Sequence, residues 1–268
     1  MNKKVIYSMA LTAFLATSAA FAGGAEVVAV QNVNPFNGFY VGGNLDFHHT
    51  GFDINGSTDL YNSIVPPNVK PFTAELSSQN GGDRSNNLYV GPQIGWGKVF
   101  QNRWYGGLEG FADFGHANGS VSTSSVQAND FVKVTNSAQV GDNYGVASKL
   151  GVLLTPTTLA YAKLGVSWAQ IKTSVSFDTL YKTASNSNRD MKPGFVWGVG
   201  AEQFVWKDLV SLYGEYTYES FGSVSTSATM PIAETIAGKA DLTVNASSKA
   251  NVSAFTGGVN FHFLNNWF

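Results

Sequence analysis

The chain has 268 residues, and only 13% of them are charged, about half of the fraction that is usual in a soluble globular domain. Hydrophobic residues make up 44%, 29 residues are glycine, and cysteine is absent, which excludes disulfides, thiolate metal sites and a cysteine nucleophile. The formal net charge of −2, without a cluster of Lys and Arg, argues against nucleic-acid binding. We therefore expect much of the surface to face something other than water.

An export signal is predicted at the N-terminus. Two lysines precede an apolar stretch over residues 5–20, which ends in a small-residue cleavage pattern at Ala22. Cleavage after Ala22 makes residues 1–22 a signal peptide. We expect a short periplasmic segment over residues 23–36 and a barrel over residues 37–268. No later stretch approaches the roughly 18 apolar residues of a transmembrane helix.

Eight segments of the chain alternate between apolar and polar residues with the period of a β-strand. These segments are 38–49, 88–99, 104–116, 143–154, 159–171, 194–205, 209–221 and 252–263. Three connections are tight turns, over residues 100–103, 155–158 and 206–208. The other four connections are rich in Ser, Thr, Asn and Gly, so we interpret them as loops. They cover residues 50–87, 117–142, 172–193 and 222–251.

Long and short connections in strict alternation are typical of a closed up-and-down barrel with one end outside the cell and the other in the periplasm. One face of each segment is large and apolar, as at Phe255, Val259 and Phe261, and the other is polar, charged or glycine, as at Asn260. Abundant glycine suits a crowded interior, so the apolar face should look at lipid. The sequence thus predicts an all-β, eight-stranded antiparallel transmembrane barrel with long extracellular loops and short periplasmic turns.

Aromatic residues recur at both ends of the predicted strands, as in the girdles that mark the two membrane interfaces. The expected girdle residues are Phe39, Trp104, Trp168, Trp206, Tyr218, Phe263, Trp267 and Phe268. The alternative is the ordinary preference of aromatic residues for strands. Their recurrence at both ends favours girdles.

Five charged residues lie on the predicted inner face, at similar distances from the short turns. They are Glu109, Lys149, Lys163, Glu202 and Glu215. Ionised groups at this depth are costly unless they are paired, so we expect Glu–Lys pairs in one layer. An eight-stranded barrel is just wide enough for side chains to fill, which favours a plugged lumen. The alternative is a gate, in which rearranged pairs open a narrow conducting path.

No catalytic, cofactor or metal site is predicted. His48 and His262 can both point inward from neighbouring strands, but they lie near opposite ends of the barrel. A hydrolase needs a nucleophile with a base in reach, and no Ser lies near His262 at strand spacing. The pair Gly198 and Gly200 precedes no helix, so it is not a phosphate loop. We expect no enzymatic activity and no cofactor.

Short motifs add to this reading. They are the signal ending Ala20-Phe21-Ala22, the opening Gly38-Phe39-Tyr40-Val41-Gly42-Gly43, repeated Gly-x-Gly-x-aromatic strands and the terminal Phe268. With them the chain resembles the small outer-membrane β-barrel family that includes the OmpA transmembrane domain and the opacity-type surface proteins. The resemblance implies insertion by the outer-membrane assembly machinery and roles in surface integrity or adhesion.

Two functions remain open from the sequence. The first is a Gram-negative outer-membrane protein with a structural or host-facing role, which contacts membrane lipid, lipopolysaccharide and possible surface ligands through its loops. The second is a narrow porin-like channel for ions or small solutes. Ion conductance separates the two.

Overall fold

The computed structural model describes residues 34–62, 72–127, 130–178, 183–235 and 238–264. Their regular structure is entirely β-strand. Within these ranges, no helix has the length and apolarity needed to cross a bilayer. The predicted signal peptide, most of the segment 23–36, and Trp267 and Phe268 lie outside the described residues.

Ten strands fill eight positions in the wall. The strands are β1 (Gly38–Asn62), β2 (Phe72–Phe100), β3 (Trp104–Asp113), β4 (Ala117–Gln127), β5 (Asp130–Thr155), β6 (Thr158–Asp178), β7 (Thr183–Trp206), β8 (Val210–Phe221), β9 (Val224–Thr235) and β10 (Gly238–Leu264). Residues 114–116 separate β3 from β4, and residues 222–223 separate β8 from β9. In each pair, the second strand therefore continues the first, and the two occupy a single position in the barrel wall.

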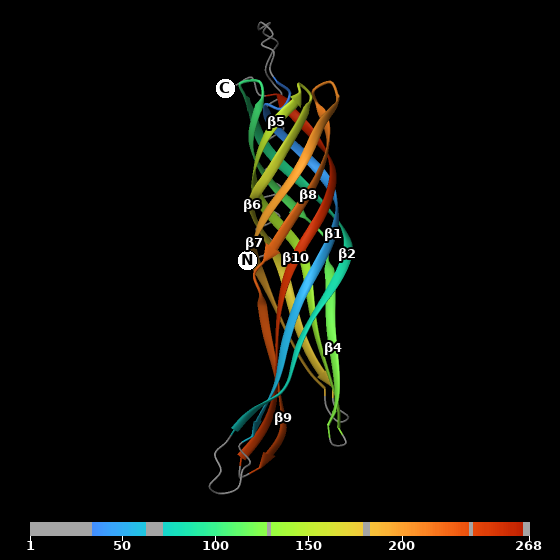
Figure 1. The fold of residues 1–268 in the computed structure, drawn as a ribbon, viewed down its shortest axis with the longest axis vertical. Coiled ribbons are helices and arrows are strands. Elements are labelled where there is room, and N and C mark those ends of the chain that lie inside the picture. Colours follow the sequence, from blue (N-terminus) through green and yellow to red (C-terminus); the bar gives the residue numbers. More distant parts are fainter. Residues whose placement is uncertain (1–33, 63–71, 128–129, 179–182, 236–237, 265–268) are drawn as a thin grey trace, which may run out of the picture. The chain divides into compact units, whose positions relative to one another are not determined.

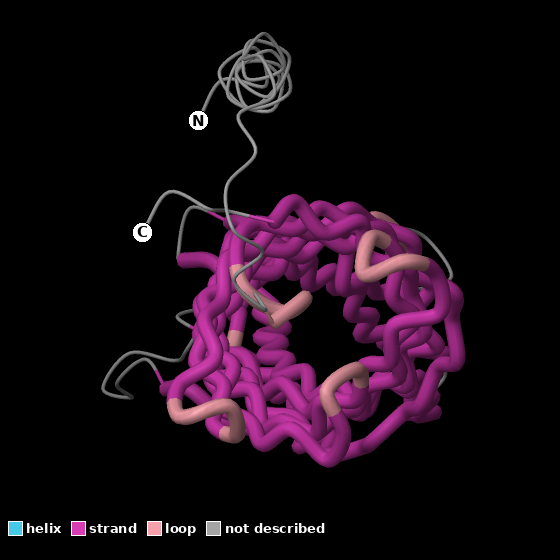
Figure 2. The backbone as a smooth tube through the Cα atoms, turned by 90° about the horizontal axis from the view of Figure 1, so that it is seen from above, coloured by secondary structure: helices cyan, strands magenta, loops and turns pink. Residues whose placement is uncertain are grey.

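The wall closes into an antiparallel ring. Neighbouring strands pair in the order β1-β2-β3-β5-β6-β7-β8-β10, and β10 pairs back with β1. Figure 2 shows this ring from one end, with strands all around it. The predicted eight-stranded antiparallel barrel is confirmed.

Tight turns join the strands at one end of the ring, which we call the turn end. Gln101 and Asn102 both have positive φ angles, as do Lys207 and Asp208. Two successive positive φ angles define a type I′ turn, which matches the twist of a hairpin and tolerates Asn and Asp. The N–H of Arg103 closes the first of these turns on the carbonyl of Phe100 at 3.1 Å.

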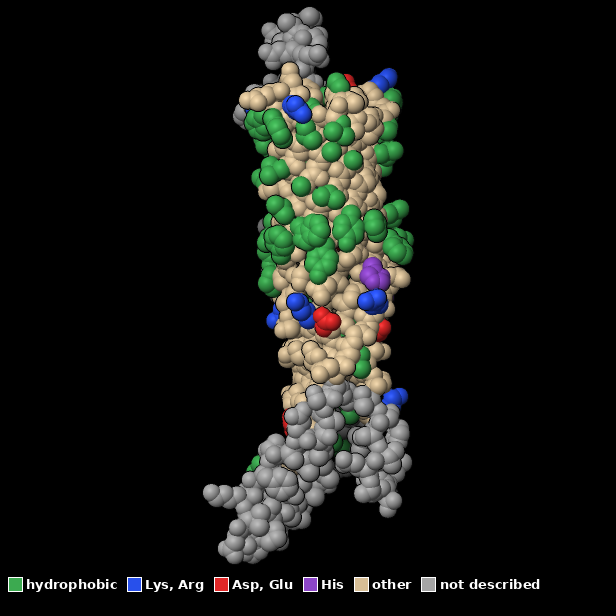
Figure 3. Space-filling model, viewed as in Figure 1, with side chains coloured by type: hydrophobic (Ala, Val, Ile, Leu, Met, Phe, Trp, Pro, Cys, Tyr) green, Lys and Arg blue, Asp and Glu red, His purple; other side chains and the backbone are tan. Residues whose placement is uncertain are grey.

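Large apolar side chains are exposed in one zone of the wall, which we call the apolar belt. On β1 it runs from Phe39 to Phe47, and on β10 from Phe255 to Phe263. Among the described residues, only Tyr61 is an exposed large hydrophobic residue far from it, with Met191 at its edge. On the face drawn in Figure 3, hydrophobic side chains cover this zone and charged side chains begin beyond it. At about 3.3 Å per residue and a tilt of about 45°, the belt is about 20 Å tall.

The strands continue far beyond the belt, in what we call the distal section. The ladder between β1 and β10 runs without a register shift from Gly38↔Leu264 to Asn62↔Ala240. The interpretation of residues 50–87, 117–142, 172–193 and 222–251 as loops was therefore wrong for most of their length. Many of their Ser and Asn residues lie on the outer face of strands whose inner face is largely apolar, as at Val244 and Ala246, whereas Asn136 and Ser248 are buried.

Among the described residues of the distal section, strand pairing does not run all around the ring. There β9, β10, β1 and β2 pair in one group, and β4, β5, β6 and β7 pair in another. Two seams separate the groups, between β2 and β4 and between β7 and β9. Pro193 on β7 lies where the seam between β7 and β9 begins, and proline has no N–H to continue a ladder. On the other side of the ring, pairing continues past Pro92 to the bridge between Val90 and Phe114. Figure 1 shows the two groups of strands separating toward their far ends, where β9 lies apart from β4.

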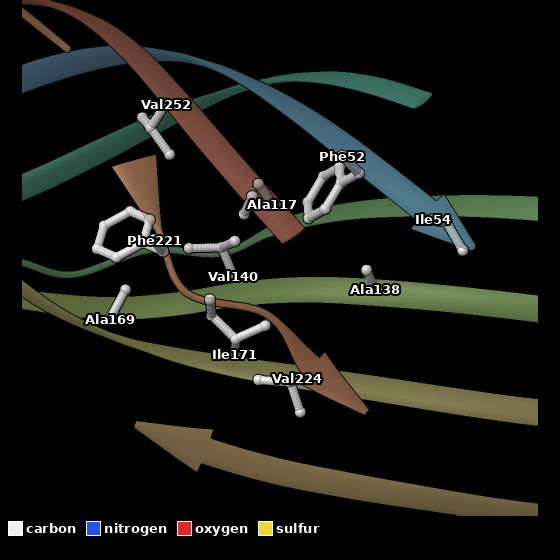
Figure 4. Packing of buried hydrophobic residues seen from close by; sticks show 11 residues of the cluster. Phe52, Ile54, Ala117, Ala138, Val140, Ala169, Ile171, Phe221, Val224 and Val252 are labelled. Atoms are coloured by element: carbon white, nitrogen blue, oxygen red, sulfur yellow. The ribbon is translucent and has the colours of Figure 1, made fainter. Parts of the chain in front are cut away.

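An apolar core fills the space between the two groups. Phe52, Ile54 and Val252 from one group meet Val140 and Ile171 from the other, and all are buried (Figure 4). A second cluster lies farther along the strands, including buried residues of β5, β6, β9 and β10. The distal section is therefore built like a two-sheet sandwich that continues from the barrel.

Candidate functional site: the barrel interior

Four buried charged side chains meet inside the ring at the level of the belt. The Lys163 ammonium lies 2.9 Å from a carboxylate oxygen of Glu109 and 2.9 Å from one of Glu215. Lys149 forms a salt bridge with the other oxygen of Glu109. Lys149 and Lys163 are direct register partners on β5 and β6, so Glu109 holds two ammonium groups that would otherwise repel each other. The group has two positive and two negative charges.

Aromatic rings surround this group. The Tyr40 hydroxyl donates to Glu109 at 2.8 Å. The Lys149 ammonium lies 4.7 Å from the ring centre of Tyr161 and 5.5 Å from those of Tyr40 and Tyr213. These cation–π contacts add to the salt bridge in a space where water is excluded. Lys149 is 1% exposed, so the lumen is filled at this level.

Glycines on the neighbouring strands, in register with the tyrosines, make room for the rings. A Cβ atom at Gly95 would lie 2.2 Å from the ring of Tyr40, and one at Gly258 would lie 2.4 Å from the ring of Tyr213. Real Cβ atoms do not approach other atoms so closely. The opening along the axis in Figure 2 is therefore a gap between backbones that side chains occupy.

Glu202, the fifth residue of the predicted layer, binds other partners nearer to the turn end. Its carboxylate accepts hydrogen bonds from Ser211 at 2.5 Å, from Asn260 at 2.9 Å and from His262 at 2.9 Å. Glu202 thus lies in a separate polar network and forms no salt bridge with a lysine among the residues that the structure describes. Gln93 extends this network by donating to Asn260 at 2.6 Å.

No Ser lies at strand spacing from His262 in the sequence, as expected, but the fold brings one close, because Ser211 on β8 contacts its Nε2 atom at 2.9 Å. The sequence hid this contact because 51 residues separate the two positions. In a hydrolase triad, the acid binds one imidazole nitrogen and the nucleophile the other. Here Glu202 and Ser211 both contact Nε2, so the group has the hydrogen bonds of a structural network.

Aromatic residues close the turn end. Phe36, in the segment expected to be periplasmic, is buried inside the ring. Its ring lies 4.7 Å from Phe204 and 6.2 Å from Tyr105. Asn37 ties the same segment to the wall by accepting a hydrogen bond from the Val99 N–H at 2.6 Å. The segment before β1 therefore closes the turn end of the barrel, and we call the buried ring of Phe36 the Phe36 stopper.

A group of buried acids lies on the distal side of the Lys163 ion pairs. Asn44 donates to Asp46 at 2.8 Å and to Asp113 at 3.0 Å, which holds the two carboxylates close together. His48 follows on the same face of β1, and its ring stacks on Tyr89 at 4.0 Å. The alternation of β1 places Asp46 and His48 on one face, but only the strand register brings Asp113 of β3 to the same level.

His48 and His262 both point inward, and both are 4% exposed. His262 is the register partner of Tyr40, and eight residues of β1 separate Tyr40 from His48. At about 3.3 Å per residue, the two histidines lie about 26 Å apart along the strands. They do not form one site.

The described girdle residues lie on the outer surface of the belt. The fractions exposed are 51% for Phe39, 56% for Trp104, 39% for Trp168, 58% for Trp206 and 40% for Phe263. Tyr218 is half-buried. Phe39, Trp104, Trp206 and Phe263 lie at the turn end, and Trp168 and Tyr218 lie at the opposite edge of the belt.

Comparisons with known proteins give distant likenesses. No family model matches the chain. An uncharacterized protein of Coxiella burnetii (strain RSA 493 / Nine Mile phase I) is 29% identical over 233 residues, which cover 81% of this chain and 82% of that protein. The chain therefore has a relative of similar length.

Solved structures with a similar course of chain are outer-membrane proteins. Ail, the attachment invasion locus protein of Yersinia pestis, has 11% identity and a TM-score of 0.32, over 85% of this chain and 99% of Ail. Neisserial surface protein A has 12% identity and a TM-score of 0.33, over 85% and 98% of the two chains. OprG of Pseudomonas aeruginosa has 13% identity and a TM-score of 0.38, over 85% and 97%. At these values, the fold assignment rests on the strand pairing of the chain itself.

Proposed function

We propose that the chain is an integral outer-membrane protein that spans the bilayer with its apolar belt and raises its distal section above the cell surface. The exposure of large apolar side chains carries this proposal. Leu45, Leu88 and Phe255 are 57%, 66% and 65% exposed. Exposing such large apolar side chains to water is unfavourable, whereas contact with lipid is not. The closed ring supports it too. Backbone N–H and C=O groups in a bilayer core must be hydrogen-bonded within the protein, and a closed ring has no edge strand with unpaired groups.

The direction of insertion follows from the two ends. Barrels of this class keep short turns in the periplasm and long connections outside the cell. The turn end would then face the periplasm, and the four distal hairpins would face the surroundings, with Ser and Asn on their outer surfaces. A structural or host-facing role at the surface fits such hairpins, and lipopolysaccharide would be the lipid next to the belt. Insertion by the outer-membrane assembly machinery belongs to the same proposal.

A closed lumen fits this role better than the porin-like channel. Along the axis, the Phe36 stopper, the Glu202 network, the Lys149 ion pairs and the distal apolar core follow one another, and each consists of buried side chains. Ions would have to displace all four layers. The proposed protein therefore conducts no ions and catalyses no reaction.

Cell-surface labelling tests the topology. Because the chain has no cysteine, Ser187→Cys in the distal section and Gln101→Cys in a tight turn give single thiols without background. A membrane-impermeant maleimide added to intact cells should label Ser187→Cys alone, and both variants after the cells are broken. Labelling of Gln101→Cys in intact cells would overturn the proposed orientation.

Single-channel recording tests the closed lumen. The mature protein, refolded into a planar bilayer, should show no conductance steps over a wide range of voltage. Reproducible steps that change in Glu109→Gln would make the ion-pair layer a gate and replace this proposal with the channel.

A further inference from the structure

We infer that Asp46, His48 and Asp113 form a binding site for one divalent transition-metal ion, such as Zn²⁺ or Mn²⁺, inside the barrel. One ligand atom from each residue lies within 4.8 Å of the other two, and all three residues are buried. Ligand atoms bound at about 2.1 Å in a tetrahedral shell lie about 3.4 Å apart. The three ligand atoms would therefore need to approach one another by at most about 1.4 Å.

An unpartnered oxygen points to a missing ligand. Asp46 is 2% exposed, and its Oδ1 atom has no hydrogen-bond partner. Asp46, His48 and Asp113 also line a void of about 10 Å³, the size of one water molecule or ion. A buried carboxylate oxygen without a donor is costly, and a cation in this void would satisfy it.

The charges around the void favour a cation as well. Lys163 lines the same void, but its ammonium already binds Glu109 and Glu215. The neutral amide of Asn44 donates to both Asp46 and Asp113, and the neutral hydroxyl of Thr256 also bonds Asp46. Two carboxylates so close together cannot both stay ionised in a buried space without a positive charge. A divalent ion would balance them.

The neighbours resemble the outer shell of a metal site. Asn44 orients both carboxylates, and stacking on Tyr89 fixes the plane of the His48 ring. Such contacts hold the ligands of a metal in place. Glu219 also lines the void, but Asn143 and Ser167 already bind its carboxylate, so it is not counted as a ligand.

The ligand set selects the class of ion. Carboxylate oxygens alone suit Ca²⁺, Mg²⁺ and Mn²⁺, whereas imidazole favours Zn²⁺ and other transition metals. Two carboxylates with one imidazole therefore fit Zn²⁺ or Mn²⁺ better than Mg²⁺, which prefers an octahedral shell of oxygens. The apolar core on the distal side and the ion pairs on the other side separate the site from bulk water, so the ion would enter during folding.

Metal analysis of the full mature chain tests the site. The protein is refolded into detergent with Zn²⁺, Mn²⁺, Mg²⁺ or EDTA, desalted, and analysed for metal by mass spectrometry. We expect about one equivalent of Zn²⁺ or Mn²⁺ and none of Mg²⁺. Less than a tenth of an equivalent of either transition metal in a folded barrel would overturn the proposal.

Matched variants locate the ion. Asp46→Asn and Asp113→Asn keep the shape of the side chain and should lower metal affinity at least about tenfold. Asp190→Asn, at an exposed carboxylate on β7, should keep the full equivalent. Retention of the ion by both Asp46→Asn and Asp113→Asn would place it elsewhere and contradict the site.

Thermal unfolding of the wild-type chain gives a second readout that does not depend on the variants. Zn²⁺ at about a hundred times its Kd should raise the unfolding temperature by about 5–10 °C relative to EDTA. The metal-free Asp46→Asn chain should unfold at or above the temperature of the metal-free wild type, because it lacks the repulsion between the two acids. An unfolding temperature that is equal with Zn²⁺ and with EDTA would contradict the proposal. Neither result affects membrane insertion, so this inference and the proposed function fail separately.

Discussion

The belt and the distal section share long strands such as β6, but the faces of these strands have opposite polarity in the two sections. On β6, Leu164 and Val166 point outward in the belt and Lys163 points inward, whereas farther along Ile171 points inward and Ser174 outward. The period of two continues through both sections, and only the face that carries apolar residues changes. The alternation of side chains is therefore a property of the extended backbone and is the same in both sections. The surroundings of each section decide which face carries apolar residues.

The two sections also differ in how their backbone N–H and C=O groups are hydrogen-bonded. The belt is hydrogen-bonded around the whole ring, but the distal section has two open seams. Lipid offers no donor or acceptor, whereas water and side chains do. Across one seam, the Asn188 side chain donates to the carbonyl of Ser225 at 3.0 Å. Across the other, the Ser120 N–H donates to Asp83 at 2.7 Å. Among the described residues, the ring is open only in the distal section, which the proposed topology exposes to water.

The strongest test of this contrast is a charge in the distal core. Ile171 is fully buried between the two groups of strands. Ile171→Asp should cost about 4 kcal/mol or more, because it buries a carboxylate without a partner. Hydrogen exchange should then show lost protection in the distal section and retained protection in the belt. Ser174→Asp, on the outer face of the same strand, should change stability by less than about 0.5 kcal/mol. Equal loss of protection in both sections would show that they are one cooperative unit.

The second test breaks the polar interior of the belt. Glu109→Gln leaves the ammonium groups of Lys149 and Lys163 side by side and should destabilise the barrel by about 3 kcal/mol. Urea unfolding in vesicles, followed by the mobility shift of the folded band on gels, measures this effect. Glu215→Gln should cost less, because Lys163 keeps Glu109. Lys149→Ala should also lower the unfolding temperature. If Glu109→Gln unfolded at the wild-type urea concentration, the ion pairs would be irrelevant to stability.

A smaller effect distinguishes the crowded inside of the belt from its lipid face. Gly95→Ala should cost about 1–3 kcal/mol, because its methyl group would collide with the ring of Tyr40. Gly257→Ala should be nearly neutral, since a Cβ atom there meets nothing within 4 Å. The same urea assay compares the two variants. Equal stabilities would mean that the interior has free space.

The smallest expected effect concerns a seam. Asn188→Ala removes the side-chain bond to Ser225 and should cost about 0.5–1.5 kcal/mol. Hydrogen exchange should become faster in β9 and remain unchanged in β8, whose backbone is paired on both sides. Ser187→Ala, on the opposite face of β7, is the control. Faster exchange in β8 as well would contradict the claim that loss of a contact across the seam leaves the closed ring unchanged.

The sequence predicted the belt correctly because three signals agree there: alternation, tight turns and large outward apolar residues. It failed in the distal section because Ser, Thr and Asn dominate those segments and favour turns. A signal was present, since Leu242, Val244 and Ala246 alternate with polar residues over a strand length. The apolar residues there are few, so the abundance of Ser, Thr and Asn masked the alternation that is typical of a strand.

The interior was only partly predictable. Inward charges follow from alternation, so Glu109, Lys149 and Lys163 could be placed on one level. Which charges bind each other depends on register between distant strands. The contact between Ser211 and His262 and the meeting of Asp46 with Asp113 both depend on such pairings, which no local pattern encodes.

The reversal of polarity along one strand is the central claim, and spin labels on β6 test it most directly. Single cysteines at Leu164, Val166, Ser174 and Ser176 all point outward, and the chain has no other cysteine. In reconstituted vesicles, labels at Leu164 and Val166 should be accessible to oxygen and protected from a water-soluble nickel chelate, with the reverse at Ser174 and Ser176. Equal access of the nickel chelate to all four positions would contradict a membrane-spanning belt.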